Sequence, residues 1–191
     1  MVNILEKYTV KVPNDIHVVY CSKKKIIVLI GIRFKKVLKL KVQLLVLKSK
    51  NVIKVTPLPF FKVSNHEQKK ISMIQGTSVA LIKQLIVEIS VTLYRKLKFI
   101  GVGYRALDLD SFKNKLLLFK LGFSHFLYFR VSMSVKIFCL KFTKLFIFGN
   151  SYTNITQIAS LIRSYKKPEP YNGKGILYDA EKVIIKEGKK I

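Results

Sequence analysis

The 191-residue chain has little negative charge, few thiols and no tryptophan. Only 10 Asp and Glu residues stand against 36 Lys and Arg residues, so the formal net charge at pH 7 is +26. A folded domain with that charge repels itself unless a polyanion or salt compensates it. The two cysteines, Cys21 and Cys139, are too few for a disulfide scaffold, and we predict that both are reduced. The charge points to nucleic acid or an anionic membrane surface as the partner.

Residues that commonly carry catalysis are also scarce. The three histidines, His17, His66 and His125, have no Cys, His or Asp at metal-ligand spacing. The carboxylates are scattered, and no nucleophile stands beside a base. Residues 101–106, Gly-Val-Gly-Tyr-Arg-Ala, match the dinucleotide-binding motif G-x-G-x-x-G/A in sequence. That motif requires a helix to begin at the glycines, and no helical pattern starts there. We therefore predict that the protein is not an enzyme and has no cofactor, no metal site and no small-molecule substrate.

A membrane-spanning segment is not predicted either. A span needs about 20 consecutive apolar residues, and basic residues interrupt the most apolar region, 116–148. The first residues show neither the apolar core of a signal peptide nor the Arg- and Ser-rich pattern of a transit peptide. We expect the protein to act where it is made. Heavy use of Lys, Ile, Phe and Asn is typical of an AT-rich genome.

Hydrophobic periodicity predicts two helices. Apolar residues recur at helical spacing over residues 79–89, and Thr77 is the expected N-cap of this helix. The same pattern covers residues 155–162, with Ser151 as the expected N-cap. Pro168 is expected to end the second helix, because proline cannot continue a helix.

Most of the remaining chain is predicted to form strands. They are marked by β-branched and aromatic runs at 16–20, 25–30, 37–41, 52–56, 99–106, 116–121, 125–131, 135–140 and 144–148. Several runs alternate Lys or Arg with apolar residues, which indicates antiparallel strands with one basic, solvated face. Because strands followed by a helix occur twice, the predicted fold class is α+β, with two tandem small domains of similar fold. Each domain is expected to be an antiparallel sheet covered by one helix, with domains at 1–95 and 96–191 joined by a short, stiff linker near 94–99.

The segment 163–191 differs from the rest of the chain. Pro168 and Pro170 stiffen an extended path, whereas Gly173 and Gly175 let the backbone approach another surface closely. Cations can reach phosphates and tyrosines can stack on a sugar or base; these residues are Arg163, Lys166, Lys167, Lys174, Tyr165 and Tyr171. Such a segment is typical of an RNA-docking element, and an ordinary solvated tail is the alternative.

Residues 168–176, Pro-Glu-Pro-Tyr-Asn-Gly-Lys-Gly-Ile, resemble PEPYKGKGI, the signature of the L-six family of large-subunit ribosomal proteins. Further matches in the same order are 76–82 to GTTRALI, 97–106 to LxxxGVGYRA, 121–125 to LGYSH, 158–163 to VAAxIR and 178–190 to YxxExVxxKxGKK. The chain departs from the family with Asn172 for the usual Lys, Leu177 for Arg and Phe126 for Pro. The GPKG turn of the family is not seen in the N-terminal half.

The resemblance implies two α+β domains of shared origin and a structural role in the large ribosomal subunit. The C-terminal domain would bind large-subunit rRNA near the stalk base and the sarcin–ricin loop. The implied partners are this rRNA and neighbouring large-subunit ribosomal proteins, with translation factors nearby. The implied rRNA-binding residues are Arg163, Lys166, Lys167, Tyr171, Gly173, Lys174, Gly175, Lys186, Lys189, Lys190, Ser124 and His125. Cations in such an interface neutralise phosphates, and RNA shape selects the site.

The genome bias favours an organelle-encoded copy in the mitochondrion, with a plastid or the cytoplasm of an AT-rich bacterium as alternatives. Two other function classes stay open. An extra-ribosomal RNA-binding protein would need an exposed aromatic platform, but the 13 Phe residues are expected mostly on the apolar side of the strands. A peripheral membrane-surface protein would need a helix with a basic and an apolar face, and the two predicted helices carry few charges.

Overall fold

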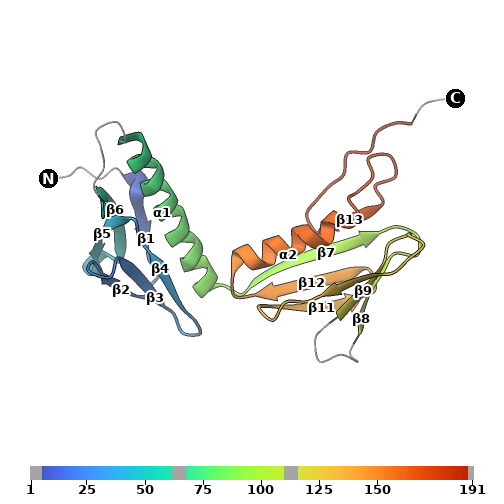
Figure 1. The fold of residues 1–191 in the computed structure, drawn as a ribbon, viewed down its shortest axis with the longest axis horizontal. Helices are drawn as coiled ribbons and strands as arrows, with labels where there is room; N and C mark the ends of the chain where they lie inside the picture. Colours follow the sequence, from blue (N-terminus) through green and yellow to red (C-terminus); the bar gives the residue numbers. More distant parts are fainter. Residues whose placement is uncertain (1–5, 62–67, 110–115, 189–191) are drawn as a thin grey trace. The chain divides into compact units, whose positions relative to one another are not determined.

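The computed structural model describes residues 6–61, 68–109 and 116–188, and the chain divides into two compact units, Met1–Val91 and Thr92–Ile191. We call these the N-terminal and the C-terminal unit. Each unit combines antiparallel sheets with one α-helix (Figure 1), so the predicted α+β class is confirmed. The predicted boundary between residues 95 and 96 falls within a strand of the C-terminal unit.

The N-terminal unit has six strands in its described residues. They are β1 (Thr9–Lys11), β2 (His17–Cys21), β3 (Ile26–Ile30), β4 (Lys35–Lys39), β5 (Val42–Leu47) and β6 (Val52–Pro59). Two short 3-10 turns, η1 (Glu6–Tyr8) and η2 (Lys48–Lys50), and the helix α1 (Gln68–Ser90) complete it. The strands form the antiparallel sheets β1-β6-β5 and β2-β3-β4, and α1 packs mainly on β6. The core includes Ile27, Leu29, Ile53 and Ile82, which are fully buried.

The C-terminal unit repeats this arrangement and adds one strand. Its strands are β7 (Leu93–Ile100), β8 (Arg105–Leu109), β9 (Leu116–Lys120), β10 (Leu127–Arg130), β11 (Val135–Lys141), β12 (Lys144–Gly149) and β13 (Gly175–Tyr178), and its helix is α2 (Tyr152–Ser164). The sheets are β11-β12-β7-β13 and β10-β9-β8. Helix α2 lies along the four-stranded sheet and packs on β7, β12 and β13 (Figure 1).

The predicted duplication is visible in the strand order. The sheet β5-β6-β1 of the N-terminal unit corresponds to β11-β12-β7 of the C-terminal unit, and β2-β3-β4 corresponds to β8-β9-β10. In each unit the α-helix follows the sixth strand. The single sheet expected in each domain is therefore two sheets around one core, and β13 is the strand that the second copy adds.

The start of the first helix was predicted wrongly. Helix α1 begins at Gln68, and Thr77 lies inside it, where its hydroxyl donates to the Ile74 carbonyl at 2.9 Å. Gly76 is also a helical residue, and a side chain there would meet open space. The turn-like sequence Gly-Thr-Ser misled the prediction because α1 is held by packing rather than by local propensity. The second helix was predicted correctly, with Ser151 as its extended N-cap residue, although the Ser151 hydroxyl bonds Thr153 rather than the backbone.

Residues 94–106 also differ from the prediction. The expected linker at 94–99 is part of β7, and the strand expected at 99–106 is interrupted by a turn between β7 and β8. Gly103 adopts φ +75° in that turn, a conformation that glycine tolerates best. Strands β1, β5 and β13 were not predicted. No helix among the described residues is long and apolar enough to cross a bilayer.

Candidate nucleic-acid interface

Residues 166–175, which run from the end of α2 to the first residue of β13, form a closed loop that we call the C-terminal loop. Its backbone is held by N–H···O=C hydrogen bonds of 2.9 Å, from Ile176 to Lys166, from Glu169 to Lys174 and from Gly173 to Glu169. Because these bonds join both ends and the middle of the segment, the loop has a defined shape without any partner. A loop that is already ordered loses less conformational entropy on binding than a disordered tail does.

The two glycines of the C-terminal loop have different structural roles. A Cβ atom on Gly175 would lie 2.6 Å from the Pro168 Cα, so only glycine lets these backbone segments meet. The close approach made by Gly175 is therefore to this chain's own backbone. Gly173 has φ +66°, and a Cβ there would meet nothing within 4 Å. Its role in the fold is conformational, and the space beside it is open.

The C-terminal loop exposes basic and aromatic side chains. Lys167, Lys174 and Tyr171 are exposed, with 53% of Tyr171 accessible to solvent. Lys186 is exposed as well, and its backbone N–H donates to the Pro170 carbonyl at 2.9 Å. That bond brings the following segment alongside the loop. Lys189 and Lys190, which were predicted to neutralise the RNA backbone, lie outside the described residues.

A second loop lies beside the first. The Lys166 ammonium sits 4.5 Å from the centroid of the Phe123 ring, a cation–π arrangement. Phe123 in turn stacks on His125, with ring centroids 5.7 Å apart and an interplanar angle of 17°. Ser124 and His125 are exposed. The structure therefore places Ser124 and His125 next to the base of the C-terminal loop. The sequence predicted these two regions as separate RNA contacts, and the fold brings them together.

Arg163 and Tyr165 are engaged inside the protein. The Arg163 guanidinium forms an ion pair with Glu181 and lies 5.3 Å from the Tyr178 ring centroid. Its Nε–H is buried and has no partner among the described residues. Tyr165 packs on Phe119 and Phe129 in the core, in contrast to the expectation that its ring stacks on a base. These contacts anchor the end of α2 to the segment after β13.

Ionisable groups elsewhere in the unit support the fold. The Lys98 ammonium lies 2.6 Å from an Asp179 carboxylate oxygen, and this hydrogen bond lowers the Asp179 pKa from its usual 3.8. Burial raises the pKa of the Cys139 thiol to about 12, and the nearby charge of Asp108 adds to the shift. A thiol with that pKa is protonated and a poor nucleophile at neutral pH. The described residues hold no group of three or more His, Cys, Asp or Glu side chains that could bind a metal ion.

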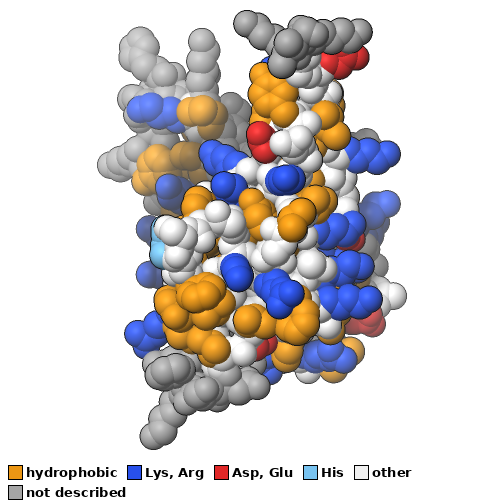
Figure 2. Space-filling model, turned by 90° about the vertical axis from the view of Figure 1, so that its right-hand side faces the viewer, with side chains coloured by type: hydrophobic (Ala, Val, Ile, Leu, Met, Phe, Trp, Pro, Cys, Tyr) orange, Lys and Arg blue, Asp and Glu red, His pale blue; other side chains and the backbone are white. Residues whose placement is uncertain are grey.

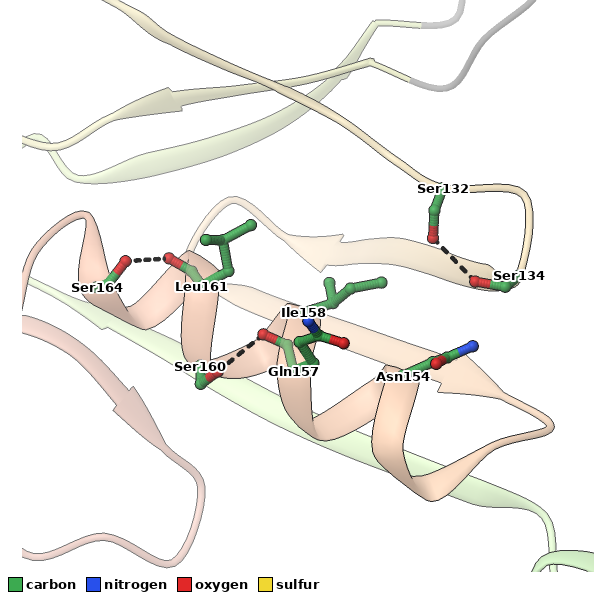
Figure 3. A pocket seen from close by; sticks show the side chains of 8 residues that line it. All are labelled: Ser132, Ser134, Asn154, Gln157, Ile158, Ser160, Leu161 and Ser164. Atoms are coloured by element: carbon green, nitrogen blue, oxygen red, sulfur yellow. Dashed lines mark hydrogen bonds between the residues drawn. The ribbon is translucent and has the colours of Figure 1, made fainter.

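A groove that runs along α2 is lined by uncharged residues. It has a volume of about 530 Å³ and runs between α2 and the segment joining β10 to β11, with lining residues that include Ser132, Ser134, Ser160 and Ser164 (Figure 3). The hydroxyls of Ser160 and Ser164 donate to helix carbonyls, and those of Ser132 and Ser134 bond each other. These hydroxyls are satisfied within the protein, and the groove presents no charge to a ligand.

The surface of the protein is predominantly basic. Figure 2 shows Lys and Arg side chains spread over one face, interleaved with hydrophobic side chains and few carboxylates. This distribution agrees with the formal net charge of +26. A duplicated α+β fold with an exposed basic loop defines a class of small basic proteins that suit a polyanionic partner.

Comparison with known proteins identifies the family. The family model described as Ribosomal protein L6 matches residues 100–179, which include the C-terminal loop. The chain is 42% identical over 123 residues to the large ribosomal subunit protein uL6 of Chlorobium limicola, which covers 64% of this chain and 66% of that protein. It is 37% identical over 129 residues to uL6 of Bordetella petrii and 35% identical over 128 residues to uL6 of Neisseria gonorrhoeae, with 67% of this chain and 70% of each relative covered.

The chain therefore belongs to the ribosomal protein L6 family. Members of this family are structural and not enzymatic, so the prediction that the protein is not an enzyme is confirmed. The chain spans about two thirds of the length of the relatives that it matches.

Proposed function

We propose that this ribosomal protein binds large-subunit rRNA mainly through its C-terminal unit and holds that RNA in place. The observation that best supports this proposal is the C-terminal loop, which is ordered by its own backbone hydrogen bonds and exposes Lys167, Lys174 and Tyr171. The ammonium groups neutralise phosphates, and the Tyr171 ring stacks on a sugar or base. Affinity then comes from charge, and selectivity comes from the match between the loop and the RNA shape.

Other predicted contacts extend this surface in different ways. Ser124 and His125 offer exposed hydrogen-bonding groups beside Lys166, and Lys186 lies along the segment that bonds Pro170. Arg163 keeps its ion pair with Glu181 and has further N–H donors left for a phosphate.

Lys189, Lys190 and the two loop glycines remain in the proposal. The lysines neutralise RNA backbone charge beyond the described residues, and Gly173 leaves open space where a nucleotide could approach the loop backbone. Gly175 keeps the base of the loop narrow.

The family resemblance supports a position for the protein near the stalk base and the factor-binding region of the large subunit. Neighbouring large-subunit proteins would be its protein partners there, and translation factors would dock nearby. The heavy use of Lys, Ile, Phe and Asn, which is typical of an AT-rich genome, supports a mitochondrial, organelle-encoded copy, with a plastid or a bacterial cytoplasm as the alternative. Fractionation of the source cells followed by detection of the protein in purified organelles tests the location separately from the RNA contact.

Sedimentation of the tagged full-length protein from its source tests the ribosomal assignment directly. We expect the protein to migrate with the large subunit at low salt and to stay bound at moderate salt. Crosslinking in those fractions should then join large-subunit rRNA to Lys174 and Tyr171, whereas exposed Lys11 of the N-terminal unit serves as the control. Protein that stays at the top of the gradient even at low salt would contradict the proposal.

An extra-ribosomal RNA-binding role is the second candidate, and one observation favours it. Exposed aromatic side chains lie beside lysines on one sheet face of the C-terminal unit, which is the platform that single-strand binding requires. A peripheral membrane role has less support, because Arg163 is the basic residue of α2 and it is paired with Glu181. Flotation with anionic liposomes separates the membrane role from both RNA roles.

A further inference from the structure

One face of the four-stranded sheet in the C-terminal unit points away from α2. In β7, β11 and β12 the residues Leu97, Ile137 and Ile147 are fully buried in the core beneath the helix. Because side chains alternate along a strand, the residues between them lie on the opposite face. That opposite face carries Tyr94, Lys96, Lys136, Phe138, Phe146 and Phe148, and we call it the aromatic–lysine face.

The strand register arranges these side chains in two rows across the sheet. Phe148 pairs with Lys136 on one side and with Tyr94 on the other. In the next row Phe146 pairs with Phe138 and with Lys96. Each row therefore combines aromatic rings with one cation. Directly opposite residues are near enough to interact, so the rows form one continuous surface.

Ring contacts confirm that the surface is continuous. Phe148 lies at its centre, with ring centroids 5.8 Å from Phe138, 6.1 Å from Phe146 and 6.1 Å from Tyr94. The Lys96 ammonium lies 5.0 Å from the Phe146 centroid and 5.5 Å from that of Tyr94. The Lys96 ammonium therefore lies among the aromatic rings, so a ligand that stacks on these rings also lies beside a positive charge.

Two of the four rings of the aromatic–lysine face are exposed, and the other two, Phe146 and Phe148, are half-buried. Tyr94 is 53% and Phe138 43% exposed, and a cluster of exposed aromatic residues marks an interaction site. The N-terminal unit has the same strand order, yet β1, β5 and β6 contain no aromatic residue. Sheet stability alone therefore does not explain the rings of the C-terminal unit.

The charge of this face favours an anionic partner. Lys96, Lys136 and Lys144 add positive charge around the rings, and the nearby carboxylate of Asp179 is paired with Lys98 of the inner strand β7. Unpaired nucleotides offer a flat base for each ring and a phosphate for each ammonium. Bases inside a duplex are stacked on each other and cannot make this contact.

We propose that the aromatic–lysine face binds an unpaired stretch of RNA, through residues other than those of the C-terminal loop. The inference rests on the proposed function for the class of ligand, and it adds a second contact of a different kind. The C-terminal loop neutralises the phosphates of shaped RNA, whereas the aromatic–lysine face stacks on single-stranded bases.

Binding of a fluorescein-labelled decauridylate to the full-length protein, measured by fluorescence anisotropy, tests the inference. Removing one ring by Phe138→Ala or Tyr94→Ala should weaken binding about tenfold, the effect of losing one stacked base. Phe142→Ala is the matched control, because Phe142 is 59% exposed in the β11–β12 turn and its ring lies by Arg105. We expect this control to bind like the unchanged protein. Circular dichroism checks that each variant is folded.

Two results would overturn the inference. In the first, decauridylate binding is equal in the unchanged protein, Phe138→Ala and Tyr94→Ala, or is absent in all of them. In the second, binding falls only with Lys174→Ala, which would place the probe on the C-terminal loop and would agree with the proposed function while removing the second site. Failure of the proposed function is read separately, as loss of co-sedimentation with the large subunit.

Discussion

The Lys166 ammonium lies 4.5 Å from the centre of the Phe123 ring and thereby joins two loops that are 43 positions apart in the chain. The double substitution Lys166→Met with Phe123→Ala tests this link against each single change. We expect a coupling free energy of about 0.5–1 kcal/mol in a double-mutant cycle of urea unfolding, as for other partly exposed cation–π pairs. A coupling near zero would show that the two loops are held together by other contacts.

Gly175→Ala should destabilise the protein strongly. The new Cβ would meet the Pro168 backbone at 2.6 Å, so the base of the C-terminal loop must open. We expect a loss of about 3 kcal/mol in the free energy of unfolding, because backbone cannot yield as a side chain does. Gly173→Ala should cost about 1–2 kcal/mol for its left-handed φ. Gly188→Ala is the control with no close neighbour, and an equal cost in all three variants would contradict the prediction.

Removing one loop cation should reduce the salt dependence of RNA binding. Lys174→Ala takes away one exposed ammonium without changing the loop backbone bonds, which use main-chain atoms. The slope of log K against log salt should become less negative by roughly 0.7–0.9, the value for one phosphate contact. Filter binding to large-subunit rRNA at several salt concentrations measures it. Lys11→Ala in the N-terminal unit should leave the slope unchanged, and an equal change in both variants would argue against a local contact.

The Lys98–Asp179 pair should stabilise the fold at neutral pH and not in strong acid. The hydrogen bond from Lys98 lowers the Asp179 pKa in the folded state below its usual 3.8. The stabilisation is therefore complete above about pH 4 and is lost as the pH falls through the folded-state pKa. Asp179→Asn should be less stable than the unchanged protein at pH 7, and the difference should shrink in unfolding experiments well below pH 3.8. A constant difference over this range would exclude the carboxylate charge as its cause.

Cys139 should resist alkylation while the protein is folded. Its pKa of about 12 lies above the usual 9.0, because burial disfavours the thiolate. Stability from the protonated thiol is present below pH 9 and is lost as the pH rises from 9 towards 12, since the unfolded chain ionises first. Mass spectrometry of iodoacetamide-treated protein at pH 8 should find Cys139 modified slowly, and quickly in urea. Fast modification in the folded state would contradict the assigned burial.

Much of the C-terminal unit could be predicted from local patterns. Helix α2 was found because its apolar spacing, its extended cap residue Ser151 and the later Pro168 agree with each other. Helix α1 was found with the wrong start, because Gly76 and Thr77 resemble a helix start in the sequence although they lie well inside a helix that packs on β6. Strand β13 was missed because Gly175–Tyr178 is short and becomes a strand only through pairing with β7.

The candidate binding surface was predicted in part. The C-terminal loop was located from its prolines, glycines and cations. Arg163 and Tyr165, which precede it at the end of α2, were also expected to contact RNA, but they face the Glu181 carboxylate and the Phe119 ring of this protein. The aromatic–lysine face was not predicted, and the phenylalanines were expected in the core. Alternation in β11 and β12 was visible in the sequence, and Lys136 and Lys144 marked the solvated set of each strand. The phenylalanines of that set were nevertheless expected in the core, because their hydrophobicity was given more weight than their place in the alternation.

By itself the sequence determined the charge of this protein, its duplicated α+β organisation, its family and the place of its basic loop, because these depend on composition, short periodicities and local motifs. The tertiary structure decided which of those residues are available to a partner. Burial and pairing depend on contacts between distant segments, as between Arg163 and Glu181 or across the rows of β7, β12 and β11. Such contacts form only when the sheet and helix pack, so no local pattern in the chain encodes them.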